Sequence, residues 1–130
     1  MPGPYSTMPI VGAFYRPPAQ ALLDAIAVDT PLLLVAEPEN QHDPNAIAVW
    51  LGSDNIPETA YVRLKENLPS SGFSLEGVLA EPVWHLGYIP RALAAELKAA
   101  NVLGEHNELA VTFAVSGKGE PRVKFPQPVL

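Results

Sequence analysis

The chain contains no cysteine among its 130 residues. A disulfide framework, a cysteine-ligated zinc site and a cysteine nucleophile are therefore excluded. Basic residues are also few: 8 Lys and Arg stand against 14 Asp and Glu, which gives a formal net charge of −6. Because a phosphate backbone favours clustered cations, this balance excludes a protein that coats duplex DNA. A module that holds a few phosphates or one chain end is still allowed.

Long apolar runs are missing as well. The longest, Pro31 to Ala36, falls far short of the roughly 18 residues that a membrane span requires. The first residues, MPGPYSTMPIV, have neither a basic leader nor the apolar core of a signal peptide. We therefore expect a soluble, cytoplasmic protein with no membrane partner.

Proline, in contrast, is abundant, with 15 residues, more than twice the usual share of roughly 5%. Proline breaks helices and the interiors of sheets, so we expect short elements joined by rigid turns and exclude an all-helical bundle. Apolar residues make up 48% of the chain, enough for an ordinary packed core. The length suits one domain, residues 1–130.

The pattern of β-prone runs and turn residues predicts most of the elements as strands. The expected strands are Ile10–Tyr15, Pro31–Ala36, Ala46–Leu51, Thr59–Lys65, Phe73–Leu79, His85–Ile89, Glu108–Val115 and Pro121–Phe125. The second and third of these should form a hairpin, and the last two a closing hairpin over residues 108–125.

Two segments have helical spacing. Apolar residues three and four apart predict a helix over Ala19–Val28, and a proline at residue 90 opens a second helix over Arg91–Ala100. Together with the strands, this predicts a mainly β protein with two short helices, in the form of a small OB-like or SH3-like β-barrel.

The most distinctive stretch is the polar loop EPENQHDPNAI, from Glu37 to Ile47, between two expected strands. Two interpretations are open. Asn40, Asp43 and Asn45 can cap their own backbone as Asx turns, the interpretation that spacing alone favours. They can also project a carboxylate and amides into a groove and hydrogen-bond a ligand hydroxyl or a base edge.

Three blocks of the chain resemble the HIRAN domain, which occurs at the N-terminus of helicase-like fork-remodelling ATPases and alone in bacteria and phages. VGAFY at Val11–Tyr15 is similar to the family's opening strand, the loop Glu37–Ile47 to its signature loop, and LGYIPR at Leu86–Arg91 to the block that begins its following helix. The resemblance covers a core of about residues 10–101. Residues 52–84 look like an insertion in this pattern, and the helix predicted before the second strand is also extra.

The resemblance implies a modified OB-like barrel that captures the 3′-hydroxyl end of single-stranded DNA in DNA repair or replication-fork processing. The implied DNA-contacting residues are Phe14, Tyr15, His42, Asp43, Asn45, Tyr88 and Arg91. Asp43 would accept a hydrogen bond from the terminal hydroxyl, rings would stack on bases, and a cation would hold a phosphate. Structural roles compete for three of them, because Phe14 suits the core, Tyr88 could pack on the barrel and Asn45 could fix the loop.

The sequence offers little for catalysis. His42, Asp43, His85 and His106 lie on three separate segments without paired-histidine spacing, so we expect neither a metal nor another cofactor. No nucleophile motif is present, and the carboxylates of the loop are weak evidence for hydrolysis. We expect a protein that is not an enzyme, since the family's ATPase motor lies in other domains, with a helicase or nuclease as partner protein. The alternative, favoured by the acidic charge and the prolines, is a protein-interaction module whose barrel groove binds a peptide or partner subunit.

Overall fold

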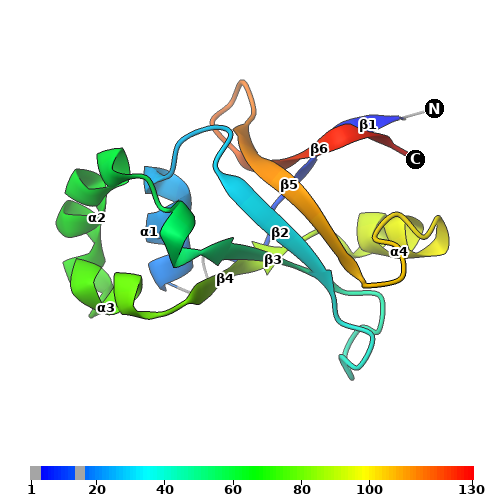
Figure 1. Ribbon diagram of the computed structural model, residues 1–130, viewed down its shortest axis with the longest axis horizontal. Helices are drawn as coiled ribbons and strands as arrows, with labels where there is room; N and C mark the ends of the chain where they lie inside the picture. The colour runs from blue at the N-terminus through cyan, green and yellow to red at the C-terminus, as the bar shows by residue number, and fades with distance from the viewer. Residues whose placement is uncertain (1–3, 14–16) are drawn as a thin grey trace.

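The computed structural model describes residues 4–13 and 17–130. Its main elements, in chain order, are β1 (Tyr5–Pro9), α1 (Pro17–Ala25), β2 (Pro31–Ala36), β3 (Ile47–Gly52), α2 (Tyr61–Asn67), α3 (Leu75–Ala80), β4 (Val83–Tyr88), α4 (Arg91–Ala99), β5 (Glu108–Val115) and β6 (Pro121–Val129). Short 3-10 helices at Ser53–Asn55, Glu58–Ala60 and Leu68–Ser71 flank α2. The strands form one antiparallel sheet in the order β1-β6-β5-β2-β3-β4 (Figure 1). The protein is therefore mainly β, as predicted.

The helices gather at two ends of the sheet. α1, α2 and α3 lie together at one end and α4 at the other (Figure 1). The core is one cluster of buried side chains from the sheet and from all four of these helices. It contains the fully buried side chains of Leu22, Val49, Leu64, Leu86 and Phe113. Trp50 lies between the buried residues Val49 and Leu51 of β3. Because successive strand residues face opposite sides, its side chain lies on the outer face of the sheet, away from the core.

Both predicted hairpins are confirmed. β2 pairs with β3 from Leu33↔Trp50 to Ala36↔Ile47, so the polar loop lies at the turn of this hairpin. β5 pairs with β6 from Thr112↔Lys124 to Val115↔Pro121. The predicted helix at residues 19–28 is also present as α1, but it ends at Ala25.

Two of the predicted strands were wrong. The strand expected at Thr59–Lys65 is replaced by α2, and the strand expected at Phe73–Leu79 is replaced by α3, so four α-helices are present among the described residues instead of two. Leu64 and Leu68 are both fully buried and lie four residues apart, the spacing of one helix face, which the apparent alternation concealed. Ser74 begins α3 by accepting a hydrogen bond from the Gly77 amide at 3.0 Å.

The first strand was predicted too late in the chain. β1 covers Tyr5–Pro9 and pairs with β6, whereas Ile10–Tyr15 was expected to be the strand. The single proline of β1, Pro9, is tolerated because β1 lies at the edge of the sheet. Phe14 and Tyr15, two of the predicted contact residues, lie outside the described residues.

One bridge links the two edges of the sheet. The Val11 amide donates to the Tyr88 carbonyl at 2.8 Å, and the Tyr88 amide donates to the Val11 carbonyl at 2.9 Å. Gly87 permits this approach, because a Cβ at that position would lie 2.5 Å from the Val11 carbonyl oxygen. The strand ladders themselves remain open in the described residues, so the closed barrel is not confirmed.

Every helix within residues 4–13 and 17–130 is too short or too polar to cross a bilayer.

Candidate functional site

The loop between β2 and β3 is held by its own Asx residues. Asn40 Oδ1 accepts hydrogen bonds from the amides of His42 at 2.9 Å and Asp43 at 3.1 Å. Asp43 Oδ1 accepts from the Asn45 amide at 3.0 Å. The structural interpretation of the loop is thus confirmed: short polar side chains replace the hydrogen bonds that a regular turn would make.

Glu37 ties this loop to β4. Its Oε1 atom accepts hydrogen bonds from the Tyr88 hydroxyl and from Asn40 Nδ2, each at 3.0 Å. The Glu37 amide also donates to the Ala46 carbonyl at 2.9 Å, which closes the base of the loop. Glu37 was not among the site residues predicted from the sequence, although its place at the head of the signature loop was the available signal.

Removal of the Tyr88 hydroxyl should therefore loosen the loop. We expect Tyr88→Phe to lower the free energy of unfolding by about 1 kcal/mol, the usual net value of one hydrogen bond. Amide hydrogen exchange in residues 37–46 should rise while exchange in α2 stays unchanged. A variant that exchanges like the wild type in the loop would show that Tyr88 does not restrain it.

A β-bulge places Tyr88 next to His85. Ala48 pairs with Tyr88 and Trp50 with His85. Two steps along β3 thus correspond to three steps along β4, and Leu86 is the extra residue. In a regular strand, residues 85 and 88 would face opposite sides of the sheet. With the bulge, their rings meet edge to face with centroids 4.7 Å apart.

The loop, β4 and the start of α4 form an open pocket of about 300 Å³. Its lining consists of Val11, Asn40, His42, Asp43, Ala46, Tyr88, Ile89 and Arg91. Four of the predicted DNA-contacting residues, His42, Asp43, Tyr88 and Arg91, are therefore brought together from separate segments. The volume is at the lower end of the range of small-ligand sites, about 300–1,000 Å³.

Asp43 and Arg91 give this pocket its charge. Asp43 Oδ1 is committed to the loop, whereas Oδ2 lies 3.8 Å from Arg91 Nε. The Arg91 side chain is 80% exposed and that of Asp43 only 18% exposed. An ion pair this open and this long contributes little to stability. The guanidinium can thus turn toward a ligand phosphate, and the carboxylate can accept a hydrogen bond from a ligand hydroxyl.

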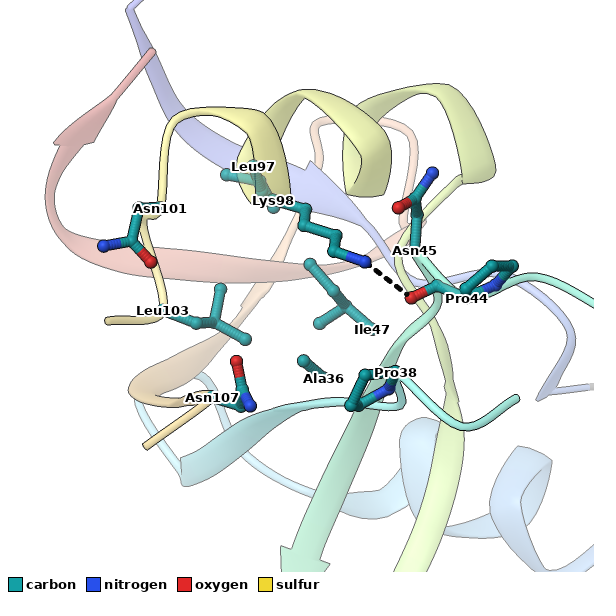
Figure 2. Close-up of a pocket in the computed structure, with 10 residues that line it drawn as sticks. All are labelled: Ala36, Pro38, Pro44, Asn45, Ile47, Leu97, Lys98, Asn101, Leu103 and Asn107. Atoms are coloured by element: carbon teal, nitrogen blue, oxygen red, sulfur yellow. Dashed lines mark hydrogen bonds between the residues drawn. The ribbon is translucent and has the colours of Figure 1, made fainter. Parts of the chain in front are cut away.

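Asn45 is not part of this pocket. It lines a neighbouring cavity of about 40 Å³ between the loop and α4, where Lys98 Nζ donates to the Pro44 carbonyl at 3.2 Å (Figure 2). Such a volume holds a few water molecules at most. The backbone amide of Asn45 completes the Asp43 turn, and the contact of its side chain with DNA stays a prediction.

Among residues 4–13 and 17–130, no three His, Asp or Glu side chains lie close enough together to hold a metal ion.

No protein-family model and no curated protein matches the chain. Among solved structures, it is similar to a structural-genomics protein from Lactobacillus plantarum, with 22% sequence identity and a TM-score of 0.54. The alignment covers 92% of this chain and 88% of that protein. At this level of identity the similarity concerns the fold alone.

Proposed function

We propose that the protein binds the 3′-hydroxyl end of single-stranded DNA in the pocket formed by the loop, β4 and α4. The observation that carries the proposal is the convergence of His42, Asp43, Tyr88 and Arg91 on one cavity. These residues come from two of the sequence blocks that resemble the HIRAN domain. Val11, from the third block, lines the same cavity.

The chemistry of the pocket suits a strand end. The partly buried carboxylate of Asp43 can accept a hydrogen bond from a hydroxyl, which a 3′ terminus offers and an internal phosphodiester does not. The exposed Arg91 can pair with the adjacent phosphate, and the rings of His42 and Tyr88 offer faces or edges to a base. The bridge between Val11 and Tyr88 supports the further proposal that the sheet is an OB-like barrel with one short closure. The further proposal that the protein acts in cytoplasmic DNA repair or fork processing, with a helicase or nuclease as partner, rests on the resemblance alone.

The proposal can be tested by fluorescence anisotropy with three labelled strands of the same sequence. One ends in a 3′-hydroxyl, one in a 3′-phosphate, and one presents only a 5′ end because its 3′ end is blocked by a hairpin. We expect binding to the first strand and at least tenfold weaker binding to the other two. Equal affinity for all three would contradict recognition of the end, and no binding to any strand would contradict the function.

The affinity for the 3′-hydroxyl strand should depend only weakly on salt concentration. Arg91 is the only Lys or Arg that lines the pocket among the described residues, so the strand can release few counterions. With about −0.7 per phosphate for single strands, we expect a log–log slope between roughly −0.7 and −2. Titrations of the 3′-hydroxyl strand from low to physiological salt measure it. A slope steeper than about −5 would indicate an extended charged surface instead of an end-binding pocket.

A peptide ligand is the second candidate. The acidic net charge and the apolar side chains of Val11, Ala46 and Ile89 in the pocket lining favour a partner protein over a polyanion. In that case the protein would bind none of the three strands and would instead retain a peptide in the same pocket, with Arg91→Ala lowering the affinity. The anisotropy experiment therefore separates the two functions.

A further inference from the structure

A row of aromatic rings leads away from the pocket across the outer face of the sheet. The Trp50 and His85 rings are stacked, with centroids 4.9 Å apart and an interplanar angle of 21°. His85 in turn contacts Tyr88 at 4.7 Å, and Tyr88 lines the pocket. The bulge at Leu86 is what places both rings of β4 on this face. The row thus connects the pocket with the middle of the sheet.

An open groove of about 320 Å³ begins where the row ends, at Trp50. Its lining consists of Pro31, Leu32, Leu33, Trp50, Gly52, Asn55 and Val83. These residues include no charged side chain, although the chain as a whole has a net charge of −6. Asn55 is exposed and supplies an amide with both donor and acceptor atoms.

We propose that this groove is a second stacking site, which takes a nucleobase of the same single strand whose 3′ end occupies the Asp43 pocket. The inference rests on the proposed function and extends its site by one base. The indole of Trp50 provides a flat apolar surface for the base. The Asn55 amide provides hydrogen bonds for a base edge. The absence of carboxylates in the lining removes repulsion of the flanking phosphates.

The spacing suits a short strand. The two centroid distances place Trp50 at most about 10 Å from Tyr88, which is roughly three nucleotides at the ~3.4 Å rise of a stacked strand. Because Trp50 does not line the pocket, we expect a dinucleotide that fills the pocket not to stack on Trp50, whereas a hexanucleotide can reach it. Length dependence with a threshold at about three or four nucleotides is the signature of this second site.

Tryptophan fluorescence can report the second site directly. The chain has 2 tryptophans, and Trp84→Phe leaves Trp50 as the sole indole. In this background, 3′-hydroxyl dT2 and dT6 are titrated while the emission and the dissociation constant are recorded. We expect dT6 to quench Trp50 and dT2 not to quench it. Trp50→Leu should raise the Kd of dT6 about 5- to 100-fold and leave that of dT2 unchanged.

Two further variants keep the test independent of folding. Trp50→Phe retains a ring and should preserve most of the preference for dT6, whereas Trp50→Leu abolishes it. Phe73→Leu removes an exposed aromatic side chain that does not line the groove, at the end of the sheet where α2 and α3 lie, and should change neither affinity. Thermal melts of all variants confirm that each is folded at the assay temperature.

The outcomes separate this inference from the proposed function. If dT2 and dT6 bind equally well through Asp43 and Trp50 emission does not change, the second site is wrong while the end-binding pocket stands. If neither oligonucleotide binds, the proposed function fails and the second site fails with it. If instead a proline-rich peptide quenches Trp50 and the oligonucleotides do not, the groove is a peptide site and the inference is overturned.

Discussion

Asp43→Asn is expected to weaken binding of a 3′-hydroxyl strand by about 1.5–3 kcal/mol, the range for a hydrogen bond to a charged group. The same variant should bind a 3′-phosphorylated strand more tightly than the wild type does. In the wild type, a terminal phosphate would lie against the Asp43 carboxylate and be repelled by it. Anisotropy with both strands against both proteins measures the two effects.

Asparagine is the informative replacement because it keeps the loop intact. Its side-chain oxygen can still accept from the Asn45 amide, as Asp43 Oδ1 does at 3.0 Å, while the negative charge is lost. Asp43→Ala removes this cap as well and should lower the melting temperature in addition to the affinity. If Asp43→Asn binds both strands as the wild type does and only Asp43→Ala weakens them, Asp43 is a structural residue of the turn.

Gly87→Ala is expected to destabilise the fold by about 1–3 kcal/mol, the range for an overpacked site. The new Cβ would lie 2.5 Å from the Val11 carbonyl oxygen, a backbone atom that cannot rotate away. Relief of this clash requires separation of the bridge between Val11 and Tyr88, which adds about 0.5–1.5 kcal/mol for each hydrogen bond lost. Urea unfolding measures the change.

Gly117→Ala is the matched control for this variant. An added Cβ there meets nothing within 4 Å, and its φ is outside the left-handed region, so stability should change by no more than about 0.5 kcal/mol. Because Val11 and Tyr88 both line the pocket, Gly87→Ala should also weaken the 3′-hydroxyl strand. Wild-type stability of Gly87→Ala would mean that the bridge contributes nothing.

The elements that the sequence predicted well are those with one dominant signal. The apolar run Pro31–Ala36 and the turn residues after it allow only a buried strand and a hairpin. Residues 59–65 fit two patterns, because Ala60, Val62 and Leu64 alternate as in a strand, while Tyr61 and Leu64 have the spacing of one helix face. The helix forms because it buries Leu64 and Leu68 together against residues distant in the chain.

The site shows the same limit. The Asx turns of Asn40 and Asp43 could be predicted from residue type, because they are local interactions. The convergence of His42, Tyr88 and Arg91 was implied only by the family resemblance, since no periodicity relates them. Trp50 could not be predicted as a neighbour of His85, because their register depends on a bulge that residue composition does not specify. The role of Glu37 could not be predicted either, because it depends on the positions of its two hydrogen-bond donors, Asn40 and Tyr88.

The pairing of β1 with β6 has a consequence for the order of folding. Thr7 pairs with Lys124, so β1 can join the sheet only after β6, near the end of the chain, has formed. The hairpins β2–β3 and β5–β6 close short loops, and contacts of low sequence separation form sooner than distant ones. Val11 follows β1 directly and reaches Tyr88 only when β1 is in place. We therefore expect the pocket to be completed in the last step of folding, so that an intermediate without β1 would have the Asx loop but no competent binding site.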